Sequence, residues 1–248
     1  MNIYPDHIKI TRHDGERGRH YTVEGVPELY NKKLTNVTTI LGMINKPGIN
    51  KWALNSALEH MADIVINYIH SSGELPDREI LVAEAKSSPA STRDQAMRRG
   101  TILHEQIEQL LTEGSMPDDS AAWPALLNFT DWYQSMQLEV VAVEQPVFSI
   151  EYEYGGTIDS LFQDTRGRYV ICDIKSGSIY PEAGMQLAAY SIALDEAGYD
   201  IAEAYVVHPE AVKAGVKVKT VNLSHAKSMY YHTLALYKGY KPKLILED

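Results

Sequence analysis

Residues 156–175, which read GTIDSLFQDTRGRYVICDIK, decide the fold. Two runs in this stretch, Gly156–Gln163 and Tyr169–Lys175, are rich in the β-branched and aromatic residues that strands favour. The segment between them, DTRGR, carries the polar and glycine signals of a turn. We therefore expect two neighbouring strands that pair through this turn.

The residues around this pair predict further strands and helices. Pro181 suits the first position of a helix and Gly198 suits the position after its end, so a helix is expected between them. The other elements expected in this half are strands at Val140–Ile150, Ile201–His208 and Val216–Leu223, and a closing helix at Ser224–Tyr240.

The N-terminal half is mainly helical by its hydrophobic periodicity. Helices are expected at Ile49–Ile69, from about Thr92 to Leu111, and at Ala121–Met136. The first 35 residues read as edge strands and turns, residues 37–41 form a β-branched run broken at Gly42, and residues 71–90 read as a loop or a hairpin of short helices. This order of elements predicts one α/β domain over residues 1–248 with a helical N-terminal portion.

Composition excludes several classes of protein. The chain has 248 residues, with 33 acidic and 23 basic side chains for a net charge of −10, and its composition is neither collagen-like nor disordered. Cys172 is its one cysteine, which excludes a disulfide scaffold and an iron–sulfur cluster. No apolar run approaches the roughly 18 residues that span a membrane, and the charged N-terminus is unlike a signal peptide. We expect a cytoplasmic protein, in a bacterium or a phage-infected cell, whose acidic charge argues against a nucleic-acid partner.

Three charged residues in the central stretch suggest chemistry. Asp159 lies in the first strand, and period-two alternation places Asp173 and Lys175 on one face of the second. If the strands pair, the two carboxylates repel each other, and Mg²⁺ or Mn²⁺ would relieve this repulsion. A lysine beside the metal can hold or deprotonate water, or stabilise charge on a phosphoryl group. The alternative is a strand-end salt bridge. A second Asp/Glu-x-Lys copy, residues 84–86, lacks strand character and a partner acid.

Other polar residues stand on predicted helices. His104 shares a face with apolar residues, as either a hydrogen-bonded core histidine or a metal ligand. Gln186 and Tyr190 are four residues apart and project from one side of their helix, which also fits an ordinary polar contact. Arg98 and Arg99 precede His104 and are either phosphate ligands or a solvent-facing pair.

In this order the motifs resemble the RecB-like branch of the PD-(D/E)XK nuclease superfamily. The similarity is to its phage-type exonucleases and to the mitochondrial genome maintenance exonuclease, and it spans roughly residues 35–195. The motifs that carry it are Val37–Gly42, Gly100–His104, Glu144, Gly156–Asp159, Asp173–Lys175 and Gln186–Tyr190.

The resemblance implies a fold and a site. The fold would be a restriction-endonuclease-like core with a central mixed β-sheet flanked by helices, residues 137–248 forming the catalytic sheet and residues 1–136 the N-terminal strands and helices. It implies that Lys175, Asp173 and Asp159 are catalytic. The implied metal ligands are His104, Asp159, Asp173 and the carbonyl of Ile174, holding Mg²⁺ or Mn²⁺. Gln186 and Tyr190 would contact substrate, and Glu144 matches the glutamate of the family and would support the site. Apart from the resemblance, Arg98 and Arg99 would contact substrate because they adjoin His104, and Glu108, one turn beyond His104, would orient that histidine. Glu144 fits a surface glutamate equally well.

The function that follows is a metal-dependent DNA exonuclease in recombination, repair or phage DNA processing. Its substrate would be DNA with a free end or a single strand, and a single-strand-binding protein or a recombinase could accompany it; no membrane partner is expected. Two alternatives stay open. One is a structure-specific or nonspecific endonuclease with the same site, and the other is a catalytically silent nucleic-acid-binding module.

Overall fold

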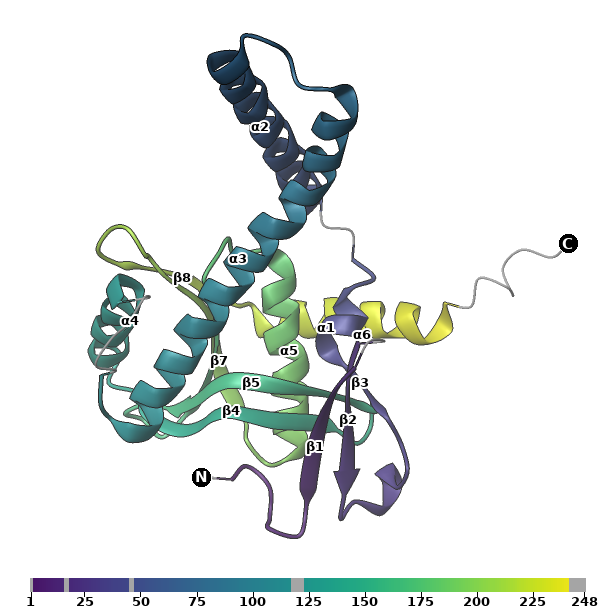
Figure 1. The fold of residues 1–248 in the computed structure, drawn as a ribbon. Coiled ribbons are helices and arrows are strands. Elements are labelled where there is room, and N and C mark those ends of the chain that lie inside the picture. The colour runs from purple at the N-terminus through teal and green to yellow at the C-terminus, as the bar shows by residue number, and fades with distance from the viewer. Residues whose placement is uncertain (1, 16–17, 45–46, 117–122, 241–248) are drawn as a thin grey trace, which may run out of the picture. The chain divides into compact units, whose positions relative to one another are not determined.

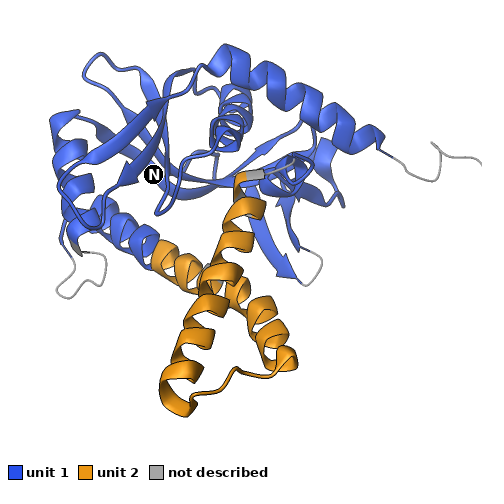
Figure 2. Cartoon of the chain, turned by 90° about the horizontal axis from the view of Figure 1, so that it is seen from above, with its two compact units in different colours: residues 1–44, 102–248 blue, residues 45–101 orange. Residues whose placement is uncertain are grey.

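A computed structural model describes residues 2–15, 18–44, 47–116 and 123–240. The chain divides into two compact units (Figure 2). The first contains Met1–Ile44 and Ile102–Asp248, and the second contains Asn45–Thr101. The division falls within one helix, where the sequence predicted a single domain. None of the helices in the described ranges has the length and hydropathy needed to cross a membrane.

The first unit is built on one mixed β-sheet (Figure 1). Its strands are β1 (Lys9–Gly15), β2 (Gly18–Glu24), β3 (Leu34–Asn36), β4 (Glu139–Ser149), β5 (Tyr154–Gln163), β6 (Tyr169–Ile174), β7 (Ile201–Pro209) and β8 (Val216–Thr220). Their order is β1-β2-β3-β5-β6-β7-β8, with β4 paired to β5. The pairs β3–β5 and β6–β7 are parallel and the others are antiparallel. The predicted antiparallel pair joined by DTRGR is β5 and β6.

Helices cover both faces of this sheet. The helices of the first unit are η1 (Pro27–Leu29), α1 (Val37–Leu41), the end of α3 (Arg78–Glu113) from Ile102 on, α4 (Trp123–Ser135), α5 (Pro181–Glu196) and α6 (Leu223–Gly239). The helix α2 (Pro47–Ser72) and the first part of α3 belong to the second unit. One core cluster contains buried residues of α1, α5 and α6, and a second contains those of α4 and the C-terminal part of α3. Strand β6 serves both, because Ile171 faces the first cluster while Val170 and Cys172 face the second. The unit is therefore an α/β structure with a mixed sheet between helices.

Helix α5 begins at Pro181 and ends before Gly198, as the sequence predicted. Proline fits this start because a first-turn residue needs no hydrogen-bonded N–H, and Gly198 takes a positive φ of 90° after the helix end. Residues on several sides of the helix are buried. The sheet lies on one side and α6 packs on another, which explains why the segment is apolar almost all round.

Two predicted segments differ from the structure. The β-branched run at residues 37–41 forms the helix α1, because Val37, Ile40 and Leu41 bury one helical face against the core; this packing outweighs the β propensity of single residues. Residues 71–90 are mostly helical, since α3 begins at Arg78 and continues through Pro89. The start predicted for α4, residues 121–122, lies outside the described residues.

The second unit pairs α2 with the N-terminal part of α3. Small polar residues meet between them: Ser88 Oγ donates to the carbonyl of Ser56 at 3.4 Å, and the hydroxyls of Ser56 and Thr92 are 3.5 Å apart. His60 Nε2 lies 3.2 Å from Glu84 Oε2. The second Asp/Glu-x-Lys copy therefore lies on a helix, with its acid paired to a histidine.

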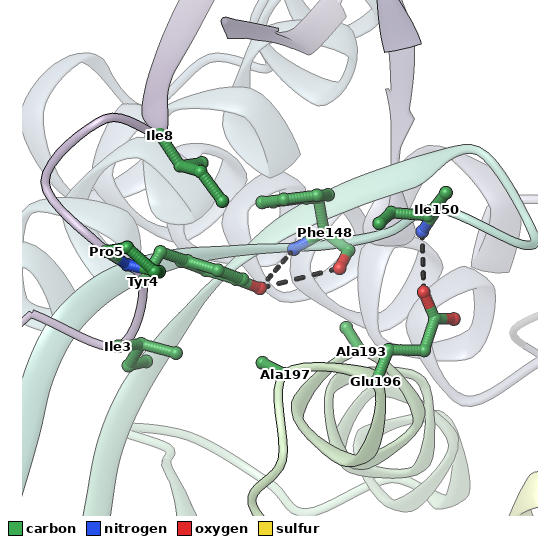
Figure 3. Close-up of a pocket in the computed structure, with 9 residues that line it drawn as sticks. All are labelled: Ile3, Tyr4, Pro5, Ile8, Phe148, Ile150, Ala193, Glu196 and Ala197. Atoms are coloured by element: carbon green, nitrogen blue, oxygen red, sulfur yellow. Dashed lines mark hydrogen bonds between the residues drawn. The ribbon is translucent and has the colours of Figure 1, made fainter. Parts of the chain in front are cut away.

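Residues of the N-terminal segment line a pocket together with residues of β4 and α5 (Figure 3). The ring of Tyr4 stacks on Phe148 with centroids 4.6 Å apart, and its hydroxyl accepts a hydrogen bond from the Phe148 N–H at 3.1 Å. Beside it, Ile150 N–H donates to Glu196 at 2.6 Å. A small, mainly apolar pocket lies among these residues. The Tyr4 hydroxyl and the Glu196 carboxylate, which line it, are each hydrogen-bonded to the protein.

Gly25, which follows β2, provides a test of this packing. Its φ is +84°, and a Cβ added there would lie 2.3 Å from the carbonyl oxygen of His7. Gly198 has a similar φ of +90° with nothing within 4 Å of an added Cβ. Both Gly→Ala variants should lose about 1 kcal/mol of unfolding free energy to the left-handed backbone, and Gly25→Ala roughly 1–3 kcal/mol more to the clash. Equal losses in urea denaturation would contradict the close approach.

Candidate active site

The sheet opens beside β5, and the candidate site lies at this opening. On one edge β5 pairs with β3 at Tyr154 and Gly155, and with β6 only from Ser160 onward. For residues 156–159 the described ladder gives no strand partner on that edge. Asp159 is the last of these residues, so its side chain stands where β5 and β6 separate.

Side chains take over the pairing at the end of β6. The N–H of Ile174 donates to Asp159 Oδ2 at 2.6 Å, and the carbonyl of Ile174 accepts from His104 Nε2 at 2.8 Å. Side chains therefore form the hydrogen bonds of both the N–H and the carbonyl of Ile174, on the edge of β6 that faces β5. His104 comes from α3, so the helix is tied directly to the strand end.

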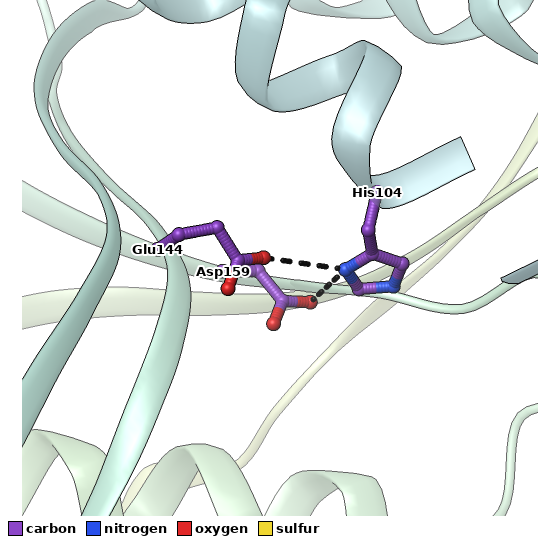
Figure 4. A group of neighbouring side chains, drawn as sticks. All are labelled: His104, Glu144 and Asp159. Atoms are coloured by element: carbon purple, nitrogen blue, oxygen red, sulfur yellow. Dashed lines mark hydrogen bonds and ion pairs between the residues drawn. The ribbon is translucent and has the colours of Figure 1, made fainter. Parts of the chain in front are cut away.

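The hydrogen bond to Ile174 determines how the His104 ring is presented. A carbonyl can only accept, so Nε2 carries the hydrogen, and Nδ1 faces Glu144 Oε1 at 3.5 Å and Asp159 Oδ2 at 3.7 Å (Figure 4). Burial opposes a charge on the ring, but Glu144 and Asp159 outweigh it and raise the pKa of His104 to about 9. In the neutral ring Nδ1 carries no proton, and its lone pair would point at the carboxylates of Glu144 and Asp159.

Glu144 reaches this point through an unusual backbone conformation. Val143 pairs with Ser160 and Gln145 with Ile158, so Glu144 falls opposite Asp159 in the ladder of β4 and β5. Its φ is +47°, in the left-handed region that a residue with a Cβ rarely adopts. Such strain persists where the surroundings over-determine it, commonly at functional sites. The half-buried carboxylate is therefore part of the cluster. Glu144 is not the surface glutamate that the sequence also allowed.

Asp173 and Lys175 form the other half of the site. Lys175 Nζ lies 2.8 Å from Asp173 Oδ1 and 2.7 Å from Oδ2, and the carboxylate is almost fully buried. Burial raises the pKa of Asp173, and Lys175 opposes that rise. Burial and then repulsion from Asp173 raise the pKa of Asp159 to about 7. The predicted convergence of two carboxylates and one ammonium is therefore present, and the strand-end salt bridge is one part of it.

Three donors are placed to hold a metal ion. One ligand atom each from His104, Glu144 and Asp159 lie within 4.8 Å of one another. Two carboxylates and one imidazole suit a divalent cation, and such an ion would also relieve the repulsion between the buried acids. The ligands implied by the sequence were His104, Asp159, Asp173 and Ile174. In the structure Lys175 engages Asp173 and His104 engages the carbonyl of Ile174, while Glu144 completes the cluster.

Gln186 and Tyr190 meet beside the acids. Gln186 Nε2 donates to the Tyr190 hydroxyl at 3.1 Å. The pKa of Tyr190 is raised by burial and then by Asp159 and Asp173. Its ring fills the space beside Gly156, where a Cβ would lie 2.3 Å from Cε1. Tyr190 is itself buried, so of the two residues the half-buried Gln186 is better placed to meet a ligand.

A second tyrosine was not found from the sequence. Tyr21, from β2, is fully buried and lies against Gly155, and its hydroxyl is 2.9 Å from Thr157 Oγ1. The two adjacent glycines of β5 thus accommodate one tyrosine each. The pair Gly155–Gly156 is the one local signal for these contacts, because Tyr21 is remote in sequence.

The remaining predicted residues lie outside this group of contacts. Glu108 is half-buried one turn beyond His104, and its pKa is raised by burial and then by Glu144 and Glu105. The hydrogen bonds described for His104 go to Glu144 and Ile174 rather than to Glu108. Arg98 and Arg99 are exposed residues of α3 that belong to the second unit.

Comparisons with known proteins add little to this geometry. No protein-family model matches the chain, and no match was found among curated proteins. Among solved structures the chain is similar to the crystal structure of SSO0001, with 14% sequence identity over 77% of this chain and 85% of that chain. The TM-score is 0.31, which is too low to support a conclusion about fold or function.

The electrostatics of Asp159 give a testable result. Asp159→Asn keeps an acceptor for the Ile174 N–H and removes a buried charge, so it should raise the unfolding free energy at pH 8 by on the order of 1 kcal/mol. Because the pKa of Asp159 is raised to about 7, its ionised form opposes folding. This penalty is full above about pH 7 and fades as the pH falls toward the ordinary value of about 4. The gain should shrink accordingly in metal-free urea denaturation.

Asp164, in the turn between β5 and β6, is the matched control. Its carboxylate accepts hydrogen bonds from the backbone of Arg166 and Arg168, and its pKa is lowered, chiefly by Arg168. Asp164→Asn should therefore lower stability at pH 8, the opposite sign to Asp159→Asn. A loss in both variants would show that Asp159 does not carry the penalty inferred for it.

Proposed function

We propose that the chain is a metal-dependent deoxyribonuclease with a restriction-endonuclease-like core, and that it acts as an exonuclease. One observation carries this proposal: His104, Glu144 and Asp159 converge from three elements beside the ion pair of the buried Asp173 with the half-buried Lys175. The antiparallel strands β5 and β6 also support it, because they carry Asp159 and Asp173, and Lys175 directly follows the end of β6. Recombination, repair or phage DNA processing would be its setting.

Each group in the site has a chemical part in this proposal. His104, Glu144 and Asp159 would hold Mg²⁺ or Mn²⁺, and such an ion would supply Lewis-acid chemistry at the phosphate and at the attacking water. Burial opposes the charge of Lys175, but Asp173 and Asp159 raise its pKa, so the side chain stays an ammonium. A charged lysine suits stabilisation of the negative charge that develops on the phosphoryl group better than removal of a proton.

The net charge of −10 is compatible with DNA as the substrate. Part of the acidic excess lies in Glu144, Asp159 and Asp173, where Lys175 and a bound divalent cation would neutralise the local negative charge. Affinity for DNA should then depend on the metal and fall as salt rises. A single-strand-binding protein or a recombinase would act at the same DNA end rather than in the site.

Substitution of Asp173 and of Lys175 tests the proposal. Lys175→Met and Asp173→Asn should each lower Mg²⁺-dependent cleavage of end-labelled DNA by at least on the order of 100-fold, because a preorganised charge at the phosphate is lost. Lys86→Met is the matched control, since Lys86 follows Glu84 in the other Asp/Glu-x-Lys copy and lies exposed on α3. Circular dichroism checks folding. Cleavage at the native rate by Lys175→Met would refute this assignment.

The form of the DNA distinguishes an exonuclease from an endonuclease. An exonuclease should digest linear single-stranded DNA in Mg²⁺ or Mn²⁺, stop in EDTA, and leave a circular single strand of the same sequence intact. Opening of the circle would instead establish endonuclease activity. No cleavage of either form, with no heat of Mn²⁺ binding in calorimetry, would identify a catalytically silent module.

A further inference from the structure

The backbone of Lys175 is hydrogen-bonded to β7, and the proposed chemistry does not by itself explain how this bonding is completed. Its N–H donates to the carbonyl of Val207 at 2.8 Å, which continues the parallel pairing of β6 and β7 one residue past Ile174. In a parallel ladder the carbonyl of that same residue accepts from the N–H two residues further along the partner strand. For Lys175 that residue is Pro209.

Pro209 cannot complete the ladder, because proline has no N–H. The donor comes instead from a side chain: His208 Nδ1 lies 2.7 Å from the Lys175 carbonyl oxygen. A carbonyl only accepts, so Nδ1 carries the hydrogen. A side chain one residue before the proline thus replaces the missing main-chain donor.

The other side of the His208 ring is also occupied. Its Nε2 lies 3.9 Å from Glu210 Oε2, and Glu210 Oε1 forms an ion pair with Lys217 Nζ of β8 at 2.6 Å. The imidazole therefore stands between the Lys175 carbonyl and a carboxylate that the neighbouring strand fixes. Contacts of this kind restrict the rotation of the ring and keep Nδ1 aimed at β6.

We propose that His208 is a positioning residue for Lys175: by supplying the donor that Pro209 lacks, it fixes the end of β6 from which Lys175 reaches Asp173. Its effect on cleavage rests on the proposed nuclease function. Its effect on the strand does not, because the hydrogen bond to Lys175 exists without substrate.

Restoration of the main-chain donor provides the sharpest test. Val207 points its carbonyl at β6, so residue 209, two further along, points its N–H the same way. His208→Leu removes the imidazole donor, and adding Pro209→Ala to it returns a backbone N–H to the same carbonyl. Pro209→Ala alone is the matched control, since it leaves the imidazole in place.

The expected kinetics separate positioning from binding. His208→Leu should lower kcat for cleavage of linear DNA on the order of 10- to 100-fold, the effect of a small misplacement of a catalytic group. KM for DNA and Mn²⁺ affinity in calorimetry should stay within about twofold, because His104, Glu144 and Asp159 are untouched. The double variant should recover most of the lost kcat. Native kcat in His208→Leu, or no recovery in the double variant, would overturn the proposal.

Hydrogen exchange gives a readout that needs no cleavage. The amide of Lys175 should exchange faster in His208→Leu than in the native chain and should slow again in the double variant. If the native chain cuts no DNA, the proposed function fails while this measurement still decides the role of His208. Unchanged exchange in His208→Leu would refute that role. If His208→Leu does not fold, His208→Asn against His208→Asn with Pro209→Ala replaces it in both measurements.

Discussion

The site depends on the hydrogen bonds of the Ile174 backbone, that is, of its N–H and its carbonyl. At this residue the sheet loses β5 as a neighbour, and an open strand edge would leave buried polar groups without partners, at a cost of about 1–3 kcal/mol each. Asp159 and His104 supply those partners. Because the same two side chains also face Glu144, the need to satisfy one backbone residue brings three potential metal ligands together.

The acids bring an electrostatic conflict into the fold. Burial and the nearby Asp173 carboxylate raise the pKa of the half-buried Asp159. The strained backbone of Glu144 places a third carboxylate opposite Asp159. Lys175 and His104 offset part of this repulsion. A stable protein gains nothing from three carboxylates in this space unless a cation or a charged ligand uses them, so the conflict itself argues for function.

The sequence predicted the features that depend on residues close together in the chain, and it missed those that depend on residues far apart. Strands β5 and β6, the helix α5 and the convergence of Asp159, Asp173 and Lys175 depend on local alternation and turn signals, and all were predicted. The place of Glu144 depends on the register of β4 against β5, and that of Tyr21 on a strand more than a hundred residues away. Residues 37–41 form a helix because burial of one face outweighs their β propensity.

Glycine and proline mark the places where side chains replace ordinary strand contacts. Gly155 and Gly156 make room for Tyr21 and Tyr190, and Pro209 withholds a donor that His208 then supplies. The two glycines are explained by tyrosines from other parts of the chain, and the proline by the side chain of its own neighbour. A strand whose end is held by such side-chain contacts cannot lengthen or shift its register without breaking them. The rigidity that the proposed phosphodiester cleavage would require can therefore come from the irregular end of the sheet rather than from its regular part.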